Sequence, residues 1–377
     1  MAGVYLHIPF CRHKCNYCNF FSVASVKYRD IFVEALLREI EERYDYLEGE
    51  TVNTVYFGGG TPSLLKVEEI NQIVEKLKKH LPFNDAVEIT LEANPDDLSF
   101  DKIQQIKNET PVNRFSIGVQ SFFDDDLQYL DRVHTSSDAL RVIGDVKKAG
   151  FNNITIDLIY GIPGLTEKKW RKNLEIFFDF DLPHLSSYSL TVEPKTALAH
   201  QIQKAKRPEP DEELSIRHFE ILMEETSRHG FVHYEISNFA KKGFYSKHNS
   251  IYWLGGHYLG LGPSAHSFNG KSRQWNVASV SQYVHAGKVN KIIVEKEVLT
   301  ETQRYNEYVM TSLRTAWGID TEHIENVFGL SYKNYFLRNI DPFLKKNHVE
   351  QKGNRFVLTN QGKLFADGIA AELFREE

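Results

Sequence analysis

Short runs of β-branched and aromatic residues alternate along the chain with longer segments whose apolar residues recur at helical spacing. Such runs predict strands, because these side chains fit a pleated sheet. Six of them precede a helical segment: VYLHI at 4–8, TVYF at 54–57, VEITLE at 87–92, RFSIGVQ at 114–120, ITIDLIY at 154–160 and HLSSYSLT at 184–191. Strands that alternate with helices predict an α/β fold with a parallel sheet and outer helices.

The helical segments place apolar residues three and four positions apart, on one face of each helix. Three of these stripes are Leu36, Ile40, Tyr44 and Leu47; Ile70, Ile73, Val74 and Leu77; and Leu140, Ile143 and Val146. A closed eightfold barrel typically takes about 250 residues. Because we count six units and not eight, the sequence predicts a partial (β/α)6 barrel of the TIM-like kind, with a doubly wound sheet as the alternative.

Three domains are expected along the 377 residues. Residues 1–230 hold the partial barrel, and residues 231–295 read as an irregular connecting region rich in Gly, Tyr, Ser and His. Residues 296–377 return to helical patterns and end in HVEQKGNRFVLTNQGKLFADGIAAELF, which predicts two short strands around a KGN turn and then a helix. This order predicts a small C-terminal α+β domain of winged-helix-like type.

Charge and hydropathy narrow the classes of protein to consider. A net charge of −6 argues against general attraction to nucleic acid, which usually requires a basic domain or stripe. No run of about 18 apolar residues could span a membrane. The N-terminus, MAGVYLHIPFC, passes directly into a strand without the features of a secretory signal. We therefore expect a cytoplasmic location, in which thiols stay reduced.

All three cysteines, Cys11, Cys15 and Cys18, lie in one CxxxCxxC array. An odd, clustered count does not fit a disulfide framework, and it is one ligand short of the four that a structural zinc or complete iron-sulfur site uses. Three thiolates at this spacing can ligate three corners of a four-iron cluster and leave one iron open to a substrate or cofactor. A zinc site completed by His7 or His13 is the alternative.

Polar residues stand where the predicted strands end: GGGTP at 58–62, Glu92, Gln120, Asp157 and Thr191. Parallel α/β folds build their sites at this edge, so several such residues predict a shared pocket, although one alone would ordinarily serve as a helix cap. A buried carboxylate there needs a cation, sugar hydroxyls or water as partner. GGGTP is neither a Walker A nor a dinucleotide fingerprint, but its glycines allow a ligand close to the backbone.

The CxxxCxxC array together with six βα units resembles the radical S-adenosylmethionine (SAM) superfamily. The resemblance implies a 4Fe-4S cluster on Cys11, Cys15 and Cys18, with the amino and carboxylate groups of SAM on the open iron and a 5′-deoxyadenosyl radical as the product of its reductive cleavage. YLHIPFC, FGGGTP, LEANP, SIGVQSF, LDRVH and DLIYGIPG resemble the oxygen-independent coproporphyrinogen III oxidase-like branch over nearly the whole chain.

The same resemblance implies a set of residues that line the SAM pocket. Gly59 and Gly60 would contact the methionine amine through their backbone, Asp157 or Glu92 would bind polar groups, and Arg132 would bind a carboxylate. The full set is Tyr5, Tyr17, Gly59, Gly60, Thr61, Glu92, Gln120, Arg132, Asp157 and, more weakly, Thr191.

Two departures from the true oxidase favour a neighbouring branch. The oxidase has a further cysteine where this chain has Phe20, and it carries an extension before the motif, whereas ten residues precede Cys11 here. Both features are similar to the HemW-type haem chaperones, which are thought to bind haem and hand it on. HNSIYW at 248–253 matches the HNxxYW haem motif of that branch, which implies His248 as axial ligand, with Tyr252 and Trp253 against the macrocycle and His257 or His266 as substitutes.

The resemblance therefore implies a haem chaperone related to porphyrin metabolism, with a 4Fe-4S cluster, SAM, and haem as cargo for an acceptor protein. The alternative is a radical SAM enzyme, either a coproporphyrinogen III dehydrogenase that performs oxidative decarboxylation, which Phe20 disfavours, or a radical methyltransferase. No catalytic residue is assigned. An electron donor, transient contact with a membrane-bound acceptor, covalent attachment of haem and a homodimer all stay open.

Overall fold

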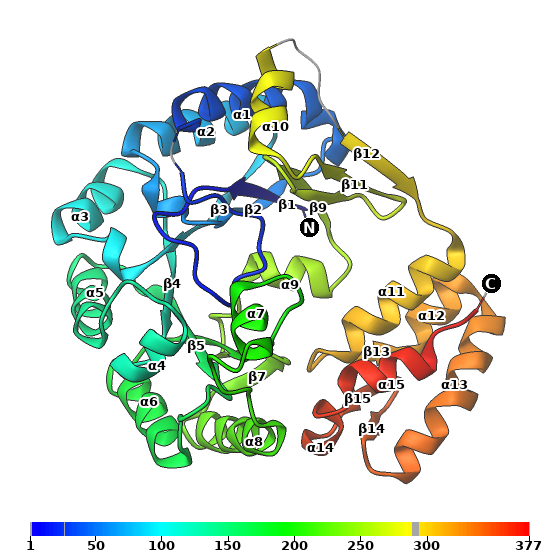
Figure 1. Ribbon diagram of the computed structural model, residues 1–377. Coiled ribbons are helices and arrows are strands. Elements are labelled where there is room, and N and C mark those ends of the chain that lie inside the picture. The colour runs from blue at the N-terminus through cyan, green and yellow to red at the C-terminus, as the bar shows by residue number, and fades with distance from the viewer. Residues whose placement is uncertain (1, 26, 289–293, 377) are drawn as a thin grey trace.

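The computed structural model describes residues 2–25, 27–288 and 294–376. Its main sheet has twelve strands in the order β12-β11-β10-β9-β1-β2-β3-β4-β5-β6-β8-β7. The central six run parallel and in sequence order: β1 Ala2–Ile8, β2 Val52–Gly59, β3 Phe83–Ala93, β4 Arg114–Gln120, β5 Asn153–Tyr160 and β6 His184–Ser189. This order has no reversal, so the doubly wound alternative is excluded and the partial barrel is confirmed (Figure 1).

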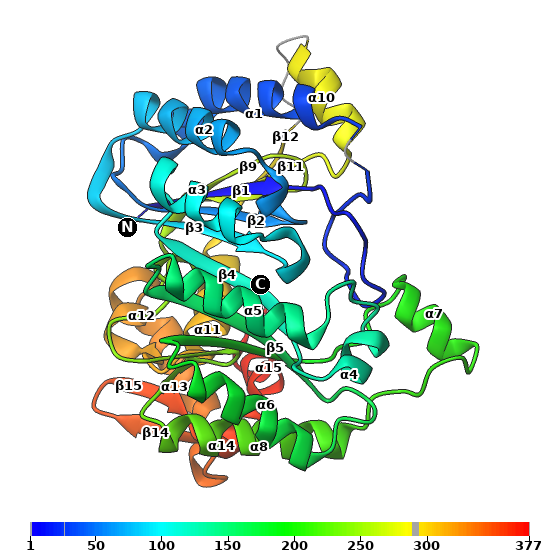
Figure 2. The ribbon, with the colours of Figure 1, turned by 90° about the vertical axis from the view of Figure 1, so that its left-hand side faces the viewer.

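Helices cover the outside of this curved sheet (Figure 1). They are α1 Arg29–Arg43, α2 Val67–His80, α3 Phe100–Glu109, α4 Asp124–Tyr129, α5 Ser136–Lys148, α6 Glu167–Asp179 and α8 Glu212–Arg228, whereas α7 Ala197–Gln203 projects beyond the carboxyl ends of the strands (Figure 2). The predicted stripe on α2 is buried in full. On α5 the prediction for Leu140 is wrong, because this side chain is 39% exposed and Ala139 and Val142 complete the buried stripe instead. Tyr44 and Leu47 form a 3-10 turn after α1.

The inner face of the parallel strands is polar, whereas their outer face is apolar. On β3, Ile89 and Leu91 belong to the hydrophobic core under the helices, and Glu92 on the opposite face points to the interior. The same alternation places Ser116 on β4 and Asp157 on β5 inside. Successive side chains of a strand point to opposite faces, so the alternation of apolar and polar residues in VEITLE already predicts an apolar outer face and a polar inner face. The result is a barrel lumen lined by hydrogen-bonding groups.

Residues 231–295 differ from the expected irregular region, because they extend the sheet at both edges. They contain β7 Val232–Glu235, β8 Asn238–Ala240, α9 Lys247–Trp253, β9 His257–Leu261, β10 His266–Phe268, β11 Ser272–Asn276 and α10 Val280–Lys288. β8 pairs antiparallel with β6, and β9 pairs parallel with β1. Strands of three to five residues carry too few alternations to be recognised by periodicity. Residues 289–293 of the expected region lie outside the described residues.

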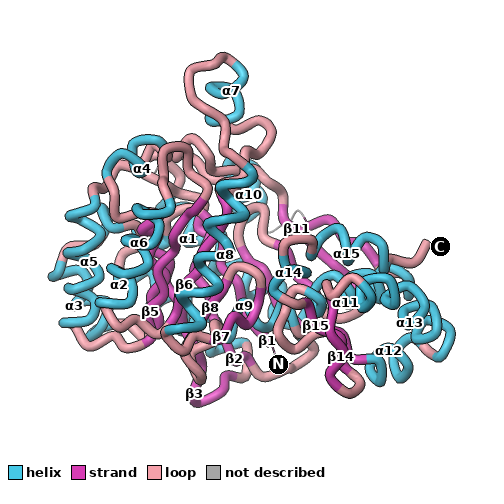
Figure 3. The backbone as a smooth tube through the Cα atoms, turned by 90° about the horizontal axis from the view of Figure 1, so that it is seen from below, coloured by secondary structure: helices cyan, strands magenta, loops and turns pink. Residues whose placement is uncertain are grey.

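The C-terminal part has its own core and packs beside the barrel (Figure 3). After β12 Val294–Val298 it contains α11 Glu301–Leu313, β13 Ile319–Asp320, α12 Thr321–Phe328, α13 Leu330–Lys345, β14 Val349–Lys352, β15 Arg355–Leu358, α14 Asn360–Lys363 and α15 Ala366–Leu373. The hairpin turns at KGN where expected, and its strands join β13 in a three-stranded sheet. In the described part of the chain, no helix has the length and apolar character needed to cross a membrane.

Candidate functional site

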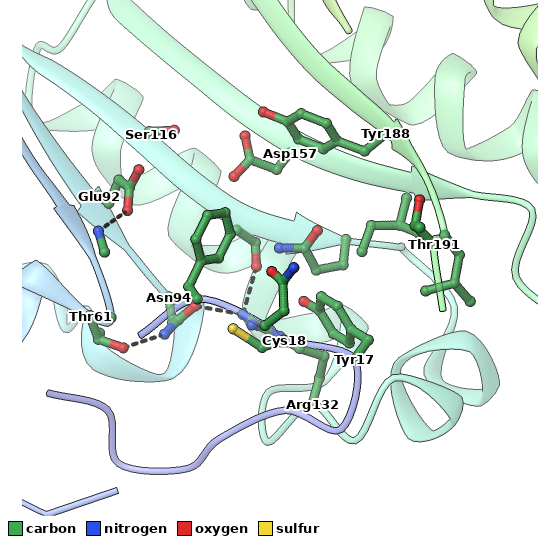
Figure 4. Close-up of a pocket in the computed structure, with 18 of the residues that line it drawn as sticks. Tyr17, Cys18, Thr61, Glu92, Asn94, Ser116, Arg132, Asp157, Tyr188 and Thr191 are labelled. Atoms are coloured by element: carbon green, nitrogen blue, oxygen red, sulfur yellow. Dashed lines mark hydrogen bonds between the residues drawn. The ribbon is translucent and has the colours of Figure 1, made fainter. Parts of the chain in front are cut away.

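A pocket of about 480 Å³ opens at the carboxyl ends of the parallel strands. Figure 2 shows the loop after β1 and helix α7 at this end of the barrel, and Figure 4 shows the pocket wall. The structure brings nine of the ten residues implied for the SAM pocket into this wall: Tyr17, Gly59, Gly60, Thr61, Glu92, Gln120, Arg132, Asp157 and Thr191. They come from strands β2 to β5 and from the loops at the same end, which is the convergence expected at this edge of a parallel sheet.

Tyr5 is the residue of the set that does not line the pocket. Its ring lies deeper in the lumen, at 6.2 Å from the ring of Tyr56 and 6.2 Å from that of His248, with interplanar angles of 27° and 28°. The Tyr5 hydroxyl lies 3.2 Å from Nδ1 of His7. Tyr5 therefore supports the floor of the site through stacking, without contact to the pocket.

The three cysteines follow β1 in a loop that runs along one side of the pocket, and Cys18 lines it. All three thiols are free and partly buried. Among the described residues, no three His, Cys, Asp or Glu side chains gather as a single metal ion would require. The two histidines of the zinc alternative have other partners here: His7 Nε2 lies 2.8 Å from the carbonyl oxygen of Phe21, and His13 pairs with Asp131.

A four-iron cluster fits this donor set better than zinc does. Such a cluster takes each thiolate at a different corner, so its ligands stay apart instead of converging on one ion. Burial raises the pKa of Cys11 and Cys18 in the absence of metal. Coordination to iron favours the thiolate and would reverse that effect. Cys11, Cys15 and Cys18 are thus suited to bind three irons of one cluster.

Arg132 holds the pocket wall together from inside. Its Nη2 donates to Oδ1 of Asn94 at 2.6 Å and to the carbonyl oxygen of Gly118 at 2.9 Å, and its Nη1 lies 3.4 Å from Sγ of Cys15. Asn94 in turn donates to Oγ1 of Thr61 at 3.0 Å. The buried Nε of Arg132 has no hydrogen-bond partner among the described residues. This unused donor beside the cysteine loop suits the carboxylate of an amino acid.

Gly59 and Gly60, at the end of β2, are closely packed against the cysteine-bearing segment. A Cβ atom on Gly59, whose φ is +105°, would lie 2.7 Å from the ring of His7, and one on Gly60 would lie 2.7 Å from the carbonyl oxygen of Phe10. Both contacts are shorter than van der Waals distance, so neither position accepts a side chain without a shift of its neighbours. Glycine is therefore required here by the packing against His7 and Phe10, and both glycines also line the pocket.

Two carboxylates face the pocket from inner positions of the sheet. Glu92 accepts a hydrogen bond from the Tyr56 hydroxyl at 2.7 Å and one from the Gly59 amide at 3.2 Å. Burial raises the pKa of Glu92. Burial and the negative charge of Glu92 raise the pKa of Asp157 to about 7. Asp157 can therefore donate or accept a hydrogen bond near neutral pH, which suits ribose hydroxyls or an ammonium group.

Several members of the wall are absent from the set that the sequence predicts. Asn94 follows Glu92 closely in LEANP, and it joins Thr61 to Arg132. Ser116 and Tyr188 also line the pocket. The period-two alternation of β4 and β6 is the signal that could identify both, because they stand on the inner face of their strands. Phe20 lines the pocket and is 65% exposed, so it is not a core residue.

The HNxxYW motif lies at the opposite end of the barrel, on helix α9 (Figure 3). His248 is 1% exposed. Its Nδ1 lies 2.7 Å from Oγ1 of Thr54 and its Nε2 lies 2.8 Å from the hydroxyl of Tyr252. Burial lowers the pKa of His248 to about 3, so the imidazole is neutral. Both ring nitrogens of His248 thus have hydrogen-bond partners. Helix α9 closes the end of the barrel opposite the pocket, which we call the barrel floor.

Trp253, the last residue of the motif, faces the C-terminal part of the chain. Trp253 lies under the guanidinium of Arg314 at 5.6 Å, and its indole Nε1 is buried without a partner among the described residues. Of the substitute histidines, His257 bonds to Glu50 and His266 stacks on Trp275 at 6.1 Å.

Tyr56 connects the HNxxYW motif with the pocket at the other end of the lumen. Its ring stacks on His248 with the ring centroids 5.0 Å apart, and its hydroxyl donates to Glu92. Glu92 lines the pocket, whereas His248 belongs to the barrel floor. A change at either end can therefore reach the other through one tyrosine side chain.

Comparison with known families matches two models to the chain. The Radical SAM superfamily model covers residues 5–176, and the HemN C-terminal domain model covers residues 299–365. The first range contains the cysteine loop and most of the pocket wall. The second corresponds to the C-terminal part with its separate core.

Similar proteins extend this match over the full length. A curated protein of Bacillus subtilis (strain 168), named heme chaperone HemW, is 35% identical, and the alignment covers 98% of both chains. A heme chaperone HemW of Lactococcus lactis subsp. lactis (strain IL1403) is 34% identical over 96% of this chain and 94% of its own. The solved structure of coproporphyrinogen III oxidase (HemN) from Escherichia coli superposes with a TM-score of 0.85 at 23% identity, over 99% of this chain and 90% of that one. This last likeness shows a shared fold.

Proposed function

Because this chain belongs to the heme chaperone HemW branch of the radical SAM superfamily, we propose that it binds haem and transfers it to an acceptor protein. Full-length identity to curated haem chaperones is the observation that carries the proposal. The three unpaired thiols fit the reducing cytoplasm as its place of action. This function requires an acceptor protein for the haem, and any electron donor would be a further partner.

A 4Fe-4S cluster on Cys11, Cys15 and Cys18, with SAM on its open iron, would occupy the pocket. When bound and reduced by one electron from an external donor, this pair would supply a 5′-deoxyadenosyl radical, with methionine as the second product. The protein's own part is to orient SAM: Gly59 and Gly60 accept the methionine end through their backbone, and the free Nε of Arg132 binds its carboxylate. Glu92 and Asp157 bind the remaining polar groups.

Haem binds at HNxxYW in this proposal, and His248 is its axial ligand. The imidazole is neutral, as an iron ligand must be, but Nε2 contacts the Tyr252 hydroxyl. Haem binding therefore requires Tyr252 to turn away and α9 to move from the barrel floor. Because Tyr56 stacks on His248 and bonds to Glu92, such a movement would also alter the SAM pocket.

Titration of the purified protein with haem, followed by the Soret band, tests the function. We expect saturable binding, and we expect His248→Ala to weaken it at least about tenfold, which corresponds to loss of roughly 1.4 kcal/mol of binding free energy. His285→Ala is the matched control, because His285 is an exposed histidine of helix α10 outside the haem motif and should leave the titration unchanged. Equal binding by wild type and His248→Ala would move the haem site elsewhere.

An anaerobic assay with coproporphyrinogen III separates the chaperone from the dehydrogenase. The protein, its reconstituted cluster, SAM and a reductant should give no decarboxylated product. Product formation would support the oxidative decarboxylase in place of the chaperone. Cluster formation is checked in the same samples by electron paramagnetic resonance, with Cys15→Ala as the variant that should lack the signal.

A further inference from the structure

Arg114 is a buried arginine without a hydrogen-bond or ion-pair partner for its side chain among the described residues. It is the first residue of β4, it is 1% exposed, and its buried Nε is unpaired. Arg43, a second buried arginine, is hydrogen-bonded, as buried polar groups usually are. Its guanidinium donates to Glu39, Ser267, Gln274, Asn276 and the carbonyl oxygen of Gly260.

The strands on either side of Arg114 leave polar atoms unpaired at the same level. Thr90 on β3 and Asn153 on β5 are its register partners. The Oγ1 of Thr90 and the Oδ1 of Asn153 are also buried without a hydrogen-bond partner among the described residues. Three neighbouring strands therefore present a guanidinium, a hydroxyl and an amide together, although buried polar groups in proteins are mostly paired.

This level lies in the lumen, one inward-facing position below the pocket floor. Glu92 and Ser116 are the next inner residues above Thr90 and Arg114, and both line the pocket (Figure 4). The positive charge of Arg114 counteracts the rise in the pKa of Glu92 and Asp157, but burial prevails at both carboxyl groups. A buried cation without a directly bonded counterion is unfavourable for folding. Its presence beneath a ligand pocket is accounted for if an anionic group enters the lumen and pairs with it.

We propose that the lumen beneath the pocket is a binding site for a carboxylate, held by Arg114 with Thr90 and Asn153 on either side. A guanidinium binds a carboxylate through two parallel hydrogen bonds, and the Thr90 hydroxyl can donate a further one. Haem carries two propionate carboxylates. Under the proposed function, on which this last step rests, a propionate of the cargo is the group that reaches Arg114.

A simple carboxylate tests the site without haem. We expect sodium propanoate at about tenfold excess over its Kd to raise the Tm of the wild type by about 2 to 4 °C relative to sodium chloride of equal ionic strength. Arg114→Met should show no such shift, whereas Arg141→Met, which removes a solvent-exposed arginine of α5, should keep it. A shift of equal size in Arg114→Met would overturn the proposal.

The unliganded variants give an independent readout. Arg114→Met should have a Tm equal to or above that of the wild type, because it removes a buried cation that has no bonded partner. Arg43→Met should lower the Tm, because it removes five hydrogen bonds and the cation that is paired with the buried carboxylate of Glu39. If Arg114→Met instead lowers the Tm as much as Arg43→Met does, Arg114 has a structural role and the site is excluded.

Haem and haem dimethyl ester separate this inference from the proposed function. The ester lacks both carboxylates, so the wild type should bind it about 10 to 100-fold more weakly than haem, and Arg114→Met should bind both ligands equally weakly. Equal binding of haem and ester by the wild type would overturn the propionate assignment while haem binding itself stands. Absence of haem binding together with an Arg114-dependent propanoate shift would exclude the haem function and support the carboxylate site.

Discussion

At the scale of single residues, the buried carboxyl group of Asp157 lowers the stability of the ligand-free fold and suits the pocket to a polar ligand. Its carboxyl group lies on the inner face of β5, and Glu92 belongs to the same pocket wall (Figure 4). Burial is the main reason that its pKa rises from 3.8 to about 7, and Glu92 adds to the effect. A carboxylic acid held in this range is partly protonated at neutral pH, so it can adapt its hydrogen bonds to the ligand.

The raised pKa has a defined consequence for stability. Between about pH 4 and pH 7 the folded protein binds the Asp157 proton more tightly than the unfolded chain does, so the free energy of unfolding falls as pH rises through this window and then levels off. We expect Asp157→Asn to be more stable than the wild type at about pH 8 by about 2 to 4 kcal/mol, and to be nearly equal to it at about pH 4. Urea unfolding of the ligand-free protein at both pH values measures this.

Asp125 is the control for that experiment, because the pKa of its carboxyl is shifted in the opposite direction. It lies on the surface, and its hydrogen bond to Lys169 lowers the pKa of its carboxyl. Asp125→Asn should therefore gain no stability at the higher pH. If Asp157→Asn is not stabilised there relative to Asp125→Asn, the carboxyl of Asp157 is solvated in the folded protein.

At the scale of elements, α9 holds a histidine in a structural role that competes with its proposed role as haem ligand. The helix packs against β1 and β2, where a Cβ atom on Gly3 would lie 3.1 Å from Nδ1 of His248. Glu88 on β3 accepts hydrogen bonds from the first backbone amides of α9. The floor is therefore tightly fitted, and iron can reach Nε2 only after Tyr252 has left it.

Tyr252→Phe tests whether His248 of α9 binds the haem iron. The change removes the hydroxyl that occupies Nε2 of His248 but keeps the ring that packs on Tyr258. If His248 binds iron, haem affinity should be unchanged or up to about tenfold higher, since one competing hydrogen bond is worth roughly 0.5 to 1.5 kcal/mol. Loss of haem binding in Tyr252→Phe would indicate the tyrosine oxygen as ligand. Absorption titration with the Soret maximum as readout decides between them.

The elements also show what the sequence can and cannot predict. The parallel strands are predictable because each combines β-branched or aromatic residues in a short run, and the period of two within them also encodes the polar lumen. The buried state of His248 is not predictable, because Thr54 and Tyr56, which enclose it, lie far away in the chain. The edge strands β7 to β11 escape prediction since each is too short to show a period.

At the scale of the whole molecule, two hydrophobic cores share one chain. The larger core fills the space between the parallel strands and their helices, and the smaller one holds α11 to α15 around the three-stranded sheet. Among the contacts that join the two parts, Arg273 pairs with Glu307 at 2.7 Å, and an isolated bridge links Glu235 to Thr315. Such a division predicts that the two parts unfold with separate stabilities.

Truncation of one buried phenylalanine in each core tests this division. Phe336 belongs to the smaller core and Phe115 to the larger, and both are fully buried. Each change to Ala should cost about 3 to 5 kcal/mol within its own part, through lost contacts and a cavity. Differential scanning calorimetry should then show Phe336→Ala lowering one transition and Phe115→Ala the other. Because the pocket belongs to the larger core, the reconstituted Phe336→Ala protein should still bind SAM. If calorimetry instead shows a single transition that both variants lower equally, the barrel and the C-terminal part fold as one unit.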